Sequence, residues 1–158
     1  TLAKDRKEHE KYIITMVGQA TINNNDLFLC YGASLVKGAY KTLLQGLQAK
    51  EIVKNTSRIE HGDRVVITED YPIKIASREL SLSFVIEGKT RSEMLSNRKS
   101  FLNDLISSTI IKFNANKLGL GFKFVFIEVT EIVDYTNNKF CKIQIKFYEP
   151  NPQDRINL

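Results

Sequence analysis

The sequence predicts an α+β domain: a curved antiparallel sheet, or a split β-barrel or sandwich, covered by one main helix over about residues 90–106. Every second residue of 80–86 is apolar, which is typical of a strand with one buried face. Thr90 stands three residues before Glu93, the spacing of a capping box at the start of a helix. Apolar residues then recur at helical spacing, so one side of this helix should pack on the sheet.

The N-terminal part predicts a charged arm at residues 1–11 and then a hairpin. Tyr12–Val17 is rich in β-forming residues and is expected to be a first strand. The Asn-Asn-Asn-Asp run at 23–26 predicts a turn, because these side chains bond to the nearby backbone and tolerate left-handed conformations. Leu27–Tyr31 would be the second strand of the hairpin.

The middle of the chain gives weaker signals. Apolar residues of 35–47 fall at helical spacing, but two glycines each cost a helix about 1 kcal/mol relative to Ala, so the segment is a helix or an irregular packed loop. A polar stretch follows, and residues 65–68 predict a short strand. Residues 73–76 follow a proline, which makes them an edge strand or the beginning of a strand.

The C-terminal part predicts a short strand at 110–113 and two long strands in a hairpin. Residues 122–133 are apolar on both faces, which indicates either that the first half of this run is buried on both sides or that one face meets another subunit. Residues 134–139 predict the turn. In 140–148 Cys141 and the apolar residues alternate with polar ones, and residues 150–158 are expected to form a C-terminal tail with little core material.

The totals describe one ordinary domain over residues 1–158. With 42% hydrophobic and 26% charged residues, the chain resembles soluble globular proteins, and it has no apolar run long enough to span a membrane. Its first dozen residues lack the apolar core of a signal peptide. The net charge of +5 is scattered, which favours a solvated surface over a dense polyanion site. Cys30 and Cys141 are expected to be unlinked thiols, as in a reducing compartment.

Few residues suggest reactive chemistry. The two histidines, His9 and His61, and the two cysteines match no zinc-ligand spacing, so we expect no metal site and no cofactor. Glu128 and Asp134 are six residues apart and are expected to share one face of a strand, with Glu131 on the other. Such carboxylates could serve acid–base chemistry or hold magnesium, but solvated charges are commoner, so we expect no catalytic residues and no enzyme.

Two short runs combine aromatic and basic residues in the manner of nucleic-acid-binding strands. They are Phe122-Lys123-Phe124 and Lys146-Phe147-Tyr148. Aromatic and lysine side chains alternate in both, so we expect the rings to face the core. A small basic nucleic-acid-binding module remains the alternative function.

Three segments together resemble a known family: residues 55–65 (Asn-Thr-Ser-Arg-Ile-Glu-His-Gly-Asp-Arg-Val), the strand and helix that begin at Arg78, and residues 149–155 (Glu-Pro-Asn-Pro-Gln-Asp-Arg). In this order they resemble small tail proteins encoded by phages and prophages of Bacteroidales bacteria. More distantly, they resemble the N-terminal, ring-forming domain of the distal tail proteins of long-tailed phages. The resemblance covers roughly residues 25–155.

The resemblance implies a structural, non-enzymatic tail protein. It implies a homo-oligomeric ring, of six subunits, or a layer of the tail tube around a channel that DNA crosses, with other tail proteins as partners. It further implies location in the tail of the virion and assembly in the cytoplasm of the bacterial host. The chain departs from the family by its charged arm and by the expected lack of a second domain, which puts host-carbohydrate binding in doubt.

Overall fold

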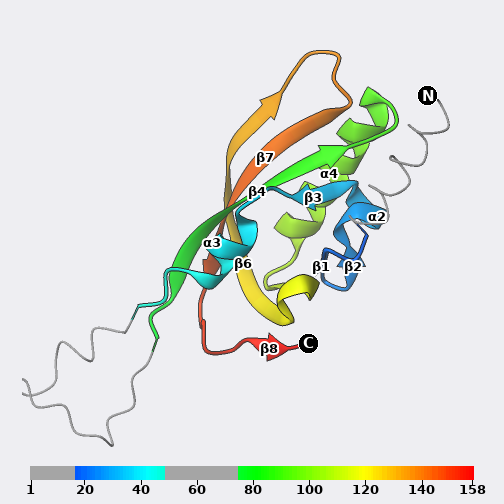
Figure 1. The fold of residues 1–158 in the computed structure, drawn as a ribbon. Coiled ribbons are helices and arrows are strands. Elements are labelled where there is room, and N and C mark those ends of the chain that lie inside the picture. The colour runs from blue at the N-terminus through cyan, green and yellow to red at the C-terminus, as the bar shows by residue number, and fades with distance from the viewer. Residues whose placement is uncertain (1–16, 49–74) are drawn as a thin grey trace, which may run out of the picture.

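A computed structural model describes residues 17–48 and 75–158 as one antiparallel sheet that curls into a half-barrel, with a long helix against one face (Figure 1). Its strands follow the order β2-β1-β5-β6-β7-β4-β3, and β8 pairs with β6. The strands are β1 (Ala20–Ile22), β2 (Asn25–Asp26), β3 (Ala33–Leu35), β4 (Arg78–Glu87), β5 (Ile111–Ala115), β6 (Leu120–Asp134), β7 (Phe140–Glu149) and β8 (Ile156–Asn157). The helices are α2 (Leu27–Tyr31), α3 (Ala39–Leu44), α4 (Arg91–Ser107) and the short 3-10 turn η2 (Asn116–Leu118). The predicted α+β class with one main covering helix is confirmed.

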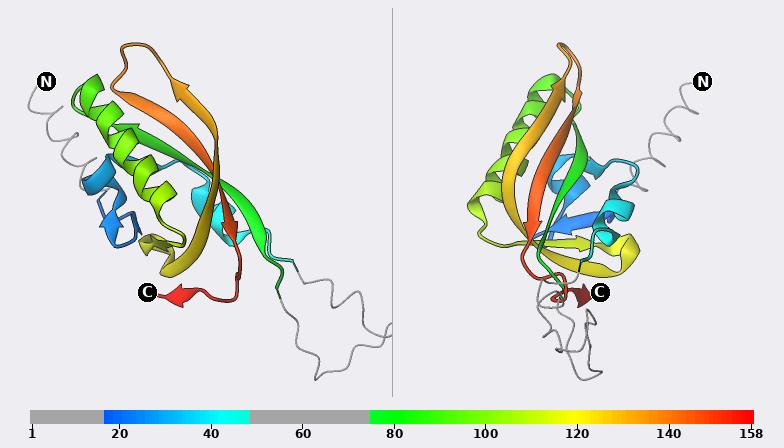
Figure 2. Two further views of the ribbon diagram at one scale, coloured as in Figure 1. Left: turned by 180° about the vertical axis from the view of Figure 1, so that it is seen from behind. Right: turned by 90° about the vertical axis from the view of Figure 1, so that its left-hand side faces the viewer.

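The longest uninterrupted pairing in the sheet is that of the antiparallel strands β4 and β7, which is continuous from Arg78–Glu149 to Glu87–Phe140. Alternation predicted both strands: the apolar positions of each are buried, and Cys141 is among them. α4 packs against the buried face of these two strands (Figure 2). The predicted hairpin turn at 134–139 joins β6 to β7.

α4 begins where its capping residues predict. The Thr90 hydroxyl accepts a hydrogen bond from the Glu93 N–H at 3.1 Å, and the Glu93 carboxylate accepts one from the Lys89 N–H, also at 3.1 Å. Phe101 and other apolar side chains of this helix are fully buried in the core. None of the helices in the described ranges is both long and apolar enough to cross a bilayer.

An aromatic cluster joins the helix to the sheet. The ring of Phe84 on β4 lies edge-on to Phe101 of α4 at 5.1 Å and to Phe147 of β7 at 6.4 Å between centroids. Phe124 of β6 stacks on Phe147 at 5.5 Å. The two halves of the sheet therefore share one core.

Two predicted elements are corrected by the structure. Leu27–Tyr31 is the helix α2, not a strand, because Asp26 accepts hydrogen bonds from two N–H groups of its first turn and so caps a helix. The predicted turn at 23–26 is right, but it joins β1 to the two residues of β2. Residues 35–47 are neither one helix nor one loop: β3 ends at Leu35 and α3 covers only Ala39–Leu44.

In the predicted C-terminal tail at 150–158 only Pro152 is buried, and the tail returns to the sheet as β8, which pairs with the start of β6. The predicted arm and the predicted strands at 12–17 and 65–68 lie outside the described residues, apart from Val17, which is in a turn. The strand at 73–76 is described only from Ile75, a single bridge residue.

β6 bends because it carries two irregularities. Its pairing with β7 shifts between Phe126 and Glu128 and again between Val129 and Glu131, each time with one extra residue on β6. Its residues up to Phe124 pair with β5 and the rest pair with β7, so one strand belongs to both halves of the half-barrel (Figure 2). Burial of its first half on both sides is excluded, because Ile127 is exposed.

Candidate functional site

The most constrained polar feature is an ion pair between the first residue of β4 and the last residue of β7. Arg78 and Glu149 are cross-strand partners, and Arg78 Nε donates to Glu149 Oε1 at 2.7 Å. The side chains of Arg78 and Glu149 are only 6% and 1% exposed, so both charged groups are shielded from bulk water. A pair so well buried is stable only where further hydrogen bonds satisfy the rest of each group.

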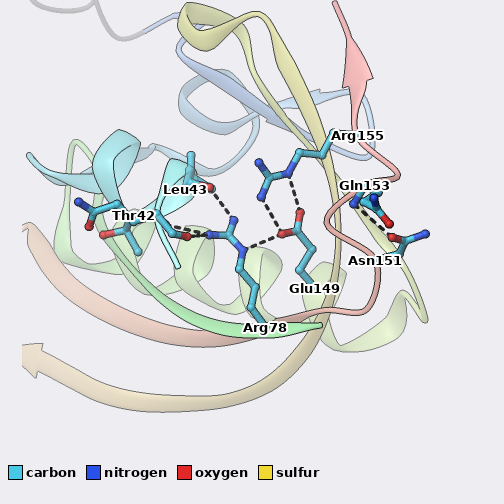
Figure 3. A network of polar contacts seen from close by, with 8 residues as sticks. Thr42, Leu43, Arg78, Glu149, Asn151, Gln153 and Arg155 are labelled. Atoms are coloured by element: carbon cyan, nitrogen blue, oxygen red, sulfur yellow. Dashed lines mark hydrogen bonds and ion pairs between the residues drawn. The ribbon is translucent and has the colours of Figure 1, made fainter. Parts of the chain in front are cut away.

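Arg78 meets this requirement at the end of α3. Its guanidinium donates to three backbone carbonyls: that of Leu43 at 2.6 Å, that of Thr42 at 3.3 Å and that of Gln45 (Figure 3). Carbonyls at the end of a helix lack partners within the helix and carry partial negative charge. One cation therefore satisfies the C-terminal end of α3 and ties it to the sheet.

Glu149 is satisfied from its other side by Arg155 of the tail. Arg155 Nη2 and Nε donate to the two carboxylate oxygens at 3.0 and 3.2 Å, a two-pronged contact. The guanidinium carbon of Arg155 also lies 4.8 Å from the centre of the Phe122 ring of β6. The turn that returns the tail is closed by a hydrogen bond from the Gln153 N–H to the Asn151 side chain at 3.1 Å (Figure 3).

This Arg78–Glu149–Arg155 cluster joins two of the three segments that carry the family resemblance. It holds α3, β4, β7 and the tail at one point, and the hydrogen bonds of Arg78, Glu149 and Arg155 go to other groups of the protein. The cluster can therefore fix the geometry of the sheet.

Sequence reasoning named Arg78 and Glu149 as parts of a motif but did not pair them. The signal was present in the alternation: Arg78 is in phase with the buried Leu80 and Leu82, and Glu149 is in phase with the buried Phe147. A charge in the buried phase of a strand requires a partner.

The second feature is an unpaired edge of β6. Its residues 125–134 pair with β7 on one side, and no described strand pairs with the other side. Ile127 and Ile132 in this stretch are 39% and 47% exposed. An exposed edge with apolar side chains is a surface for another strand, and folded proteins usually protect such edges.

The carboxylates singled out in the sequence do not converge. Glu128 is the cross-strand partner of Lys146 and Glu131 of Gln144, so both lie on the outer face of the sheet, whereas Asp134 is opposite Cys141 on the inner face. The prediction that Glu128 and Asp134 share a face was wrong. The irregularity between Val129 and Glu131 lies between these two carboxylates and adds one residue, which reverses the alternation before Asp134 is reached.

Asp134 is held by two arginines of α4. It accepts from Arg91 at 3.0 and 3.1 Å and from Arg98 at 3.1 Å, and Arg91 also donates to the carbonyls of Tyr135 and Asn138. The hydrogen bond from Arg91 is the main cause that lowers the pKa of this carboxyl group. Asp134 therefore fastens the β6–β7 turn to the helix as a carboxylate.

The remaining candidates lie apart. Both cysteines are unlinked, as predicted; Cys30 is exposed, whereas Cys141 is buried, which raises the pKa of its thiol. Within residues 17–48 and 75–158, no three histidine, cysteine or carboxylate side chains gather in a way that could hold a metal ion. His9 and His61 lie outside the described residues.

The runs that combine aromatic and basic residues place their phenylalanines in the core, as predicted. Phe122, Phe124 and Phe147 are buried. Lys123 pairs with Asp154 at 2.8 Å, and Lys146 pairs with Glu79 at 3.0 Å, the contact that raises the pKa of Lys146. Their ammonium groups are thus already neutralised by neighbouring carboxylates.

Comparison with known proteins gives one informative result. No protein-family model matches the chain, and no curated protein sequence matches it. Among solved structures, the fold is similar to that of the Dit protein (gp 19.1) of phage SPP1, described as a paradigm of the hub adsorption apparatus in phages that infect Gram-positive bacteria. The TM-score is 0.50 at 16% sequence identity, over 89% of this chain.

The likeness to the SPP1 protein supports the distant resemblance to phage distal tail proteins at the level of the fold. The chain spans about half of the SPP1 protein, 52% of its length.

Proposed function

We propose that this chain is a structural protein of a bacteriophage or prophage-derived tail and that copies of it assemble side by side into a ring or tube layer. The observation that carries the proposal is the fold shared with the SPP1 hub protein over 89% of this chain. The three segments that resemble phage tail proteins support it independently of the fold.

The unpaired edge of β6 supports the self-association. A ring needs a contact in which one surface of a subunit meets a different surface of the next. Residues 125–134 offer free backbone groups together with the exposed Ile127 and Ile132, and pairing would bury both. By resemblance we propose six subunits around a channel for passing DNA, with neighbouring tail proteins as partners, within the virion tail.

We further propose a role without catalysis. The Asp134 carboxylate is occupied by Arg91 and Arg98, and Glu128 lies on the opposite face of the sheet. The buried Arg78–Glu149–Arg155 cluster serves as a brace. In this proposal a ring subunit holds its neighbours in position and carries mechanical load, and it does not catalyse a reaction.

Native mass spectrometry and negative-stain microscopy of the purified chain test the assembly. We expect a closed ring with a central hole. Ile127→Lys together with Ile132→Lys should dissociate the ring, because two desolvated ammonium groups would oppose the contact. Leu158→Lys is the matched control: its side chain is 56% exposed, it lies in the tail, and its ring should persist. A monomer for the unmodified chain at high concentration, alone and with tail partners, would contradict the proposal.

A further inference from the structure

A groove of about 440 Å³ opens between α2, the turn from β4 to α4, and the start of β7. Phe28 and Leu29 of α2 give it an apolar side, and Leu29 is 69% exposed. The exposed residues Lys89 and Lys139 line it as well. An apolar surface of this kind among charged groups is a place for an apolar side chain of a partner.

The groove is built on backbone that is already fixed. A Cβ at Gly32 would lie 2.3 Å from the Glu87 carbonyl oxygen, so α2 and the end of β4 meet without a side chain between them. The Gly88 N–H donates to the Lys139 carbonyl at 3.0 Å, and Asn97 Nδ2 donates to the Glu87 carbonyl at 2.9 Å. An occupant would therefore not have to order the groove when it binds.

The two lysines of the groove are suited to carboxylates of a partner. Glu87 and Glu93 line the groove too, and the Glu93 carboxylate already accepts the Lys89 N–H at the start of α4. Within residues 17–48 and 75–158, the ammonium groups of Lys89 and Lys139 make no ion pair. A partner that brings an apolar side chain and carboxylates together would match both parts of the groove.

The unpaired edge of β6 carries such a combination. Ile127 is the extra residue at the first irregularity of β6, so it has no cross-strand partner on β7, and it is 39% exposed. Glu128 and Glu131 follow it and are exposed. Thr130, the extra residue at the second irregularity, differs because its hydroxyl donates to the Gln144 carbonyl at 3.1 Å. Ile127 and the two carboxylates are therefore presented to a neighbouring molecule.

The groove and the β6 edge lie toward opposite edges of the sheet. β7 and β4 separate β6 from β3, and α2 leads directly into β3 through Gly32 (Figure 1). A contact between two different surfaces can repeat from copy to copy and close a ring. Pairing of β6 with β6 of a second copy would instead bring Glu128 and Glu131 of both copies together, and like charges on adjacent strands are destabilising.

We propose that the groove receives the β6 edge of a second copy of this chain. Ile127 of one copy packs against Phe28 and Leu29 of the next, which removes apolar surface of both from water. The carboxylates that follow Ile127 approach the two lysines of the groove. This inference rests on the proposed function, because it names the surface that the β6 edge contacts in the assembly.

Mixing two charge-reversed variants of the full chain tests the contact by native mass spectrometry. The groove variant carries Lys89→Glu and Lys139→Glu, and the edge variant carries Glu128→Lys and Glu131→Lys. Alone, each should assemble about tenfold less than the unmodified chain, because like charges meet at every contact. An equimolar mixture should restore rings in which the variants alternate, since each groove then meets an edge of opposite charge. Rings from either variant alone, or a mixture without rings, would overturn the inference.

Leu29→Lys gives a second reading that does not depend on the charged pairs. Because Leu29 is 69% exposed, the fold should survive the change, and assembly should fall about tenfold as an ammonium group enters the apolar side of the groove. Ile106→Lys is the matched control: Ile106 is 62% exposed on α4, and its ring should persist. A ring that survives Leu29→Lys would overturn this inference and leave the proposed function intact. A monomeric unmodified chain would overturn both.

Discussion

Arg78 and Glu149 form a buried ion pair across neighbouring strands although 71 positions separate them in the sequence. The carboxylate is shared with Arg155, so the cluster holds two cations and one anion, with the Arg78, Arg155 and Glu149 side chains 6%, 14% and 1% exposed. The surplus cation is offset by the carbonyls at the end of α3. The cluster is thus a closed arrangement in which each member depends on the others.

Neutralising the shared carboxylate should be strongly destabilising. Glu149→Gln leaves the buried guanidinium of Arg78 and the partly buried one of Arg155 without a counter-charge, and we expect a loss of about 3–5 kcal/mol in the free energy of unfolding. Asp154→Asn, which breaks the exposed pair with Lys123, is the control and should cost about 0–1 kcal/mol. Urea denaturation measures both, and equal losses would show that burial of the cluster is not what matters.

Gly32 should tolerate no side chain. Its φ is +60°, and an added Cβ would lie 2.3 Å from the Glu87 carbonyl oxygen, so Gly32→Ala should cost about 2–4 kcal/mol. Gly38 has φ +94° with nothing within 4 Å of an added Cβ. Gly38→Ala should therefore lower the free energy of unfolding only by the cost of placing a non-glycine residue at a positive φ, about 1–2 kcal/mol. Thermal unfolding of the two variants compares them directly.

Stability should fall at alkaline pH through Tyr31. Burial, and then its hydrogen bond to Asp104, raise the pKa of this phenol from 10.0 to about 12. Its contribution is complete below pH 10, where both states keep the proton, and is lost as the pH rises toward 12, because the unfolded chain ionises first. We expect a loss of about 2–3 kcal/mol over this range. Tyr31→Phe should flatten the decline measured by denaturation between pH 9 and 11.5, leaving a smaller slope from Tyr40, whose pKa burial also raises.

The turn between β6 and β7 should loosen in acid. Because Arg91 and Arg98 lower the pKa of Asp134, its contribution is present above the ordinary carboxyl pKa and is lost as the pH falls through the lowered value. Hydrogen exchange of residues 134–140 between pH 5 and 2.5 should show this opening. Asp134→Asn should already be open at pH 5, and a turn equally protected in that variant would refute the assignment.

The two thiols should differ in reactivity. Cys30 is exposed on α2, whereas burial raises the pKa of Cys141 and keeps its sulfur from reagents. A maleimide should therefore modify one cysteine per native chain and two in denaturant, as counted by mass spectrometry. Cys30→Ser should abolish the native reaction; persistence of one modified site would place it at Cys141.

The sequence predicted the elements whose signals extend over many residues. Apolar residues recur at the spacing of a strand over residues 78–87 and at the spacing of a helix over residues 91–107, and Thr90 marks the helix start. α2 was missed because five residues are too few to show a period, so only Asp26 could have indicated it.

Side-chain placement along β6 was harder to predict for a different reason. Strand alternation assigns faces only while pairing stays regular, and each of the two extra residues of β6, one between Phe126 and Glu128 and one between Val129 and Glu131, reverses it. Those shifts arise from contact with β7, which a local pattern does not contain. The partner of Arg78 was similarly hidden, since the order of the strands in the sheet had to be known first.

The Arg78 contacts at the start of β4 also hold together the two points of the domain between which residues 49–74 lie in the sequence. The Ala76 N–H donates to the Gln48 carbonyl at 2.7 Å, and Arg78 holds the carbonyls of Thr42 and Leu43 just upstream. The residues just before position 49 and just after position 74 are thus held together by hydrogen bonds. Lengthening the chain between them would therefore raise the free energy of loop closure by only about 0.6 kcal/mol for each doubling of its length. An epitope or fluorescent peptide inserted within residues 49–74 would therefore leave the half-barrel undisturbed.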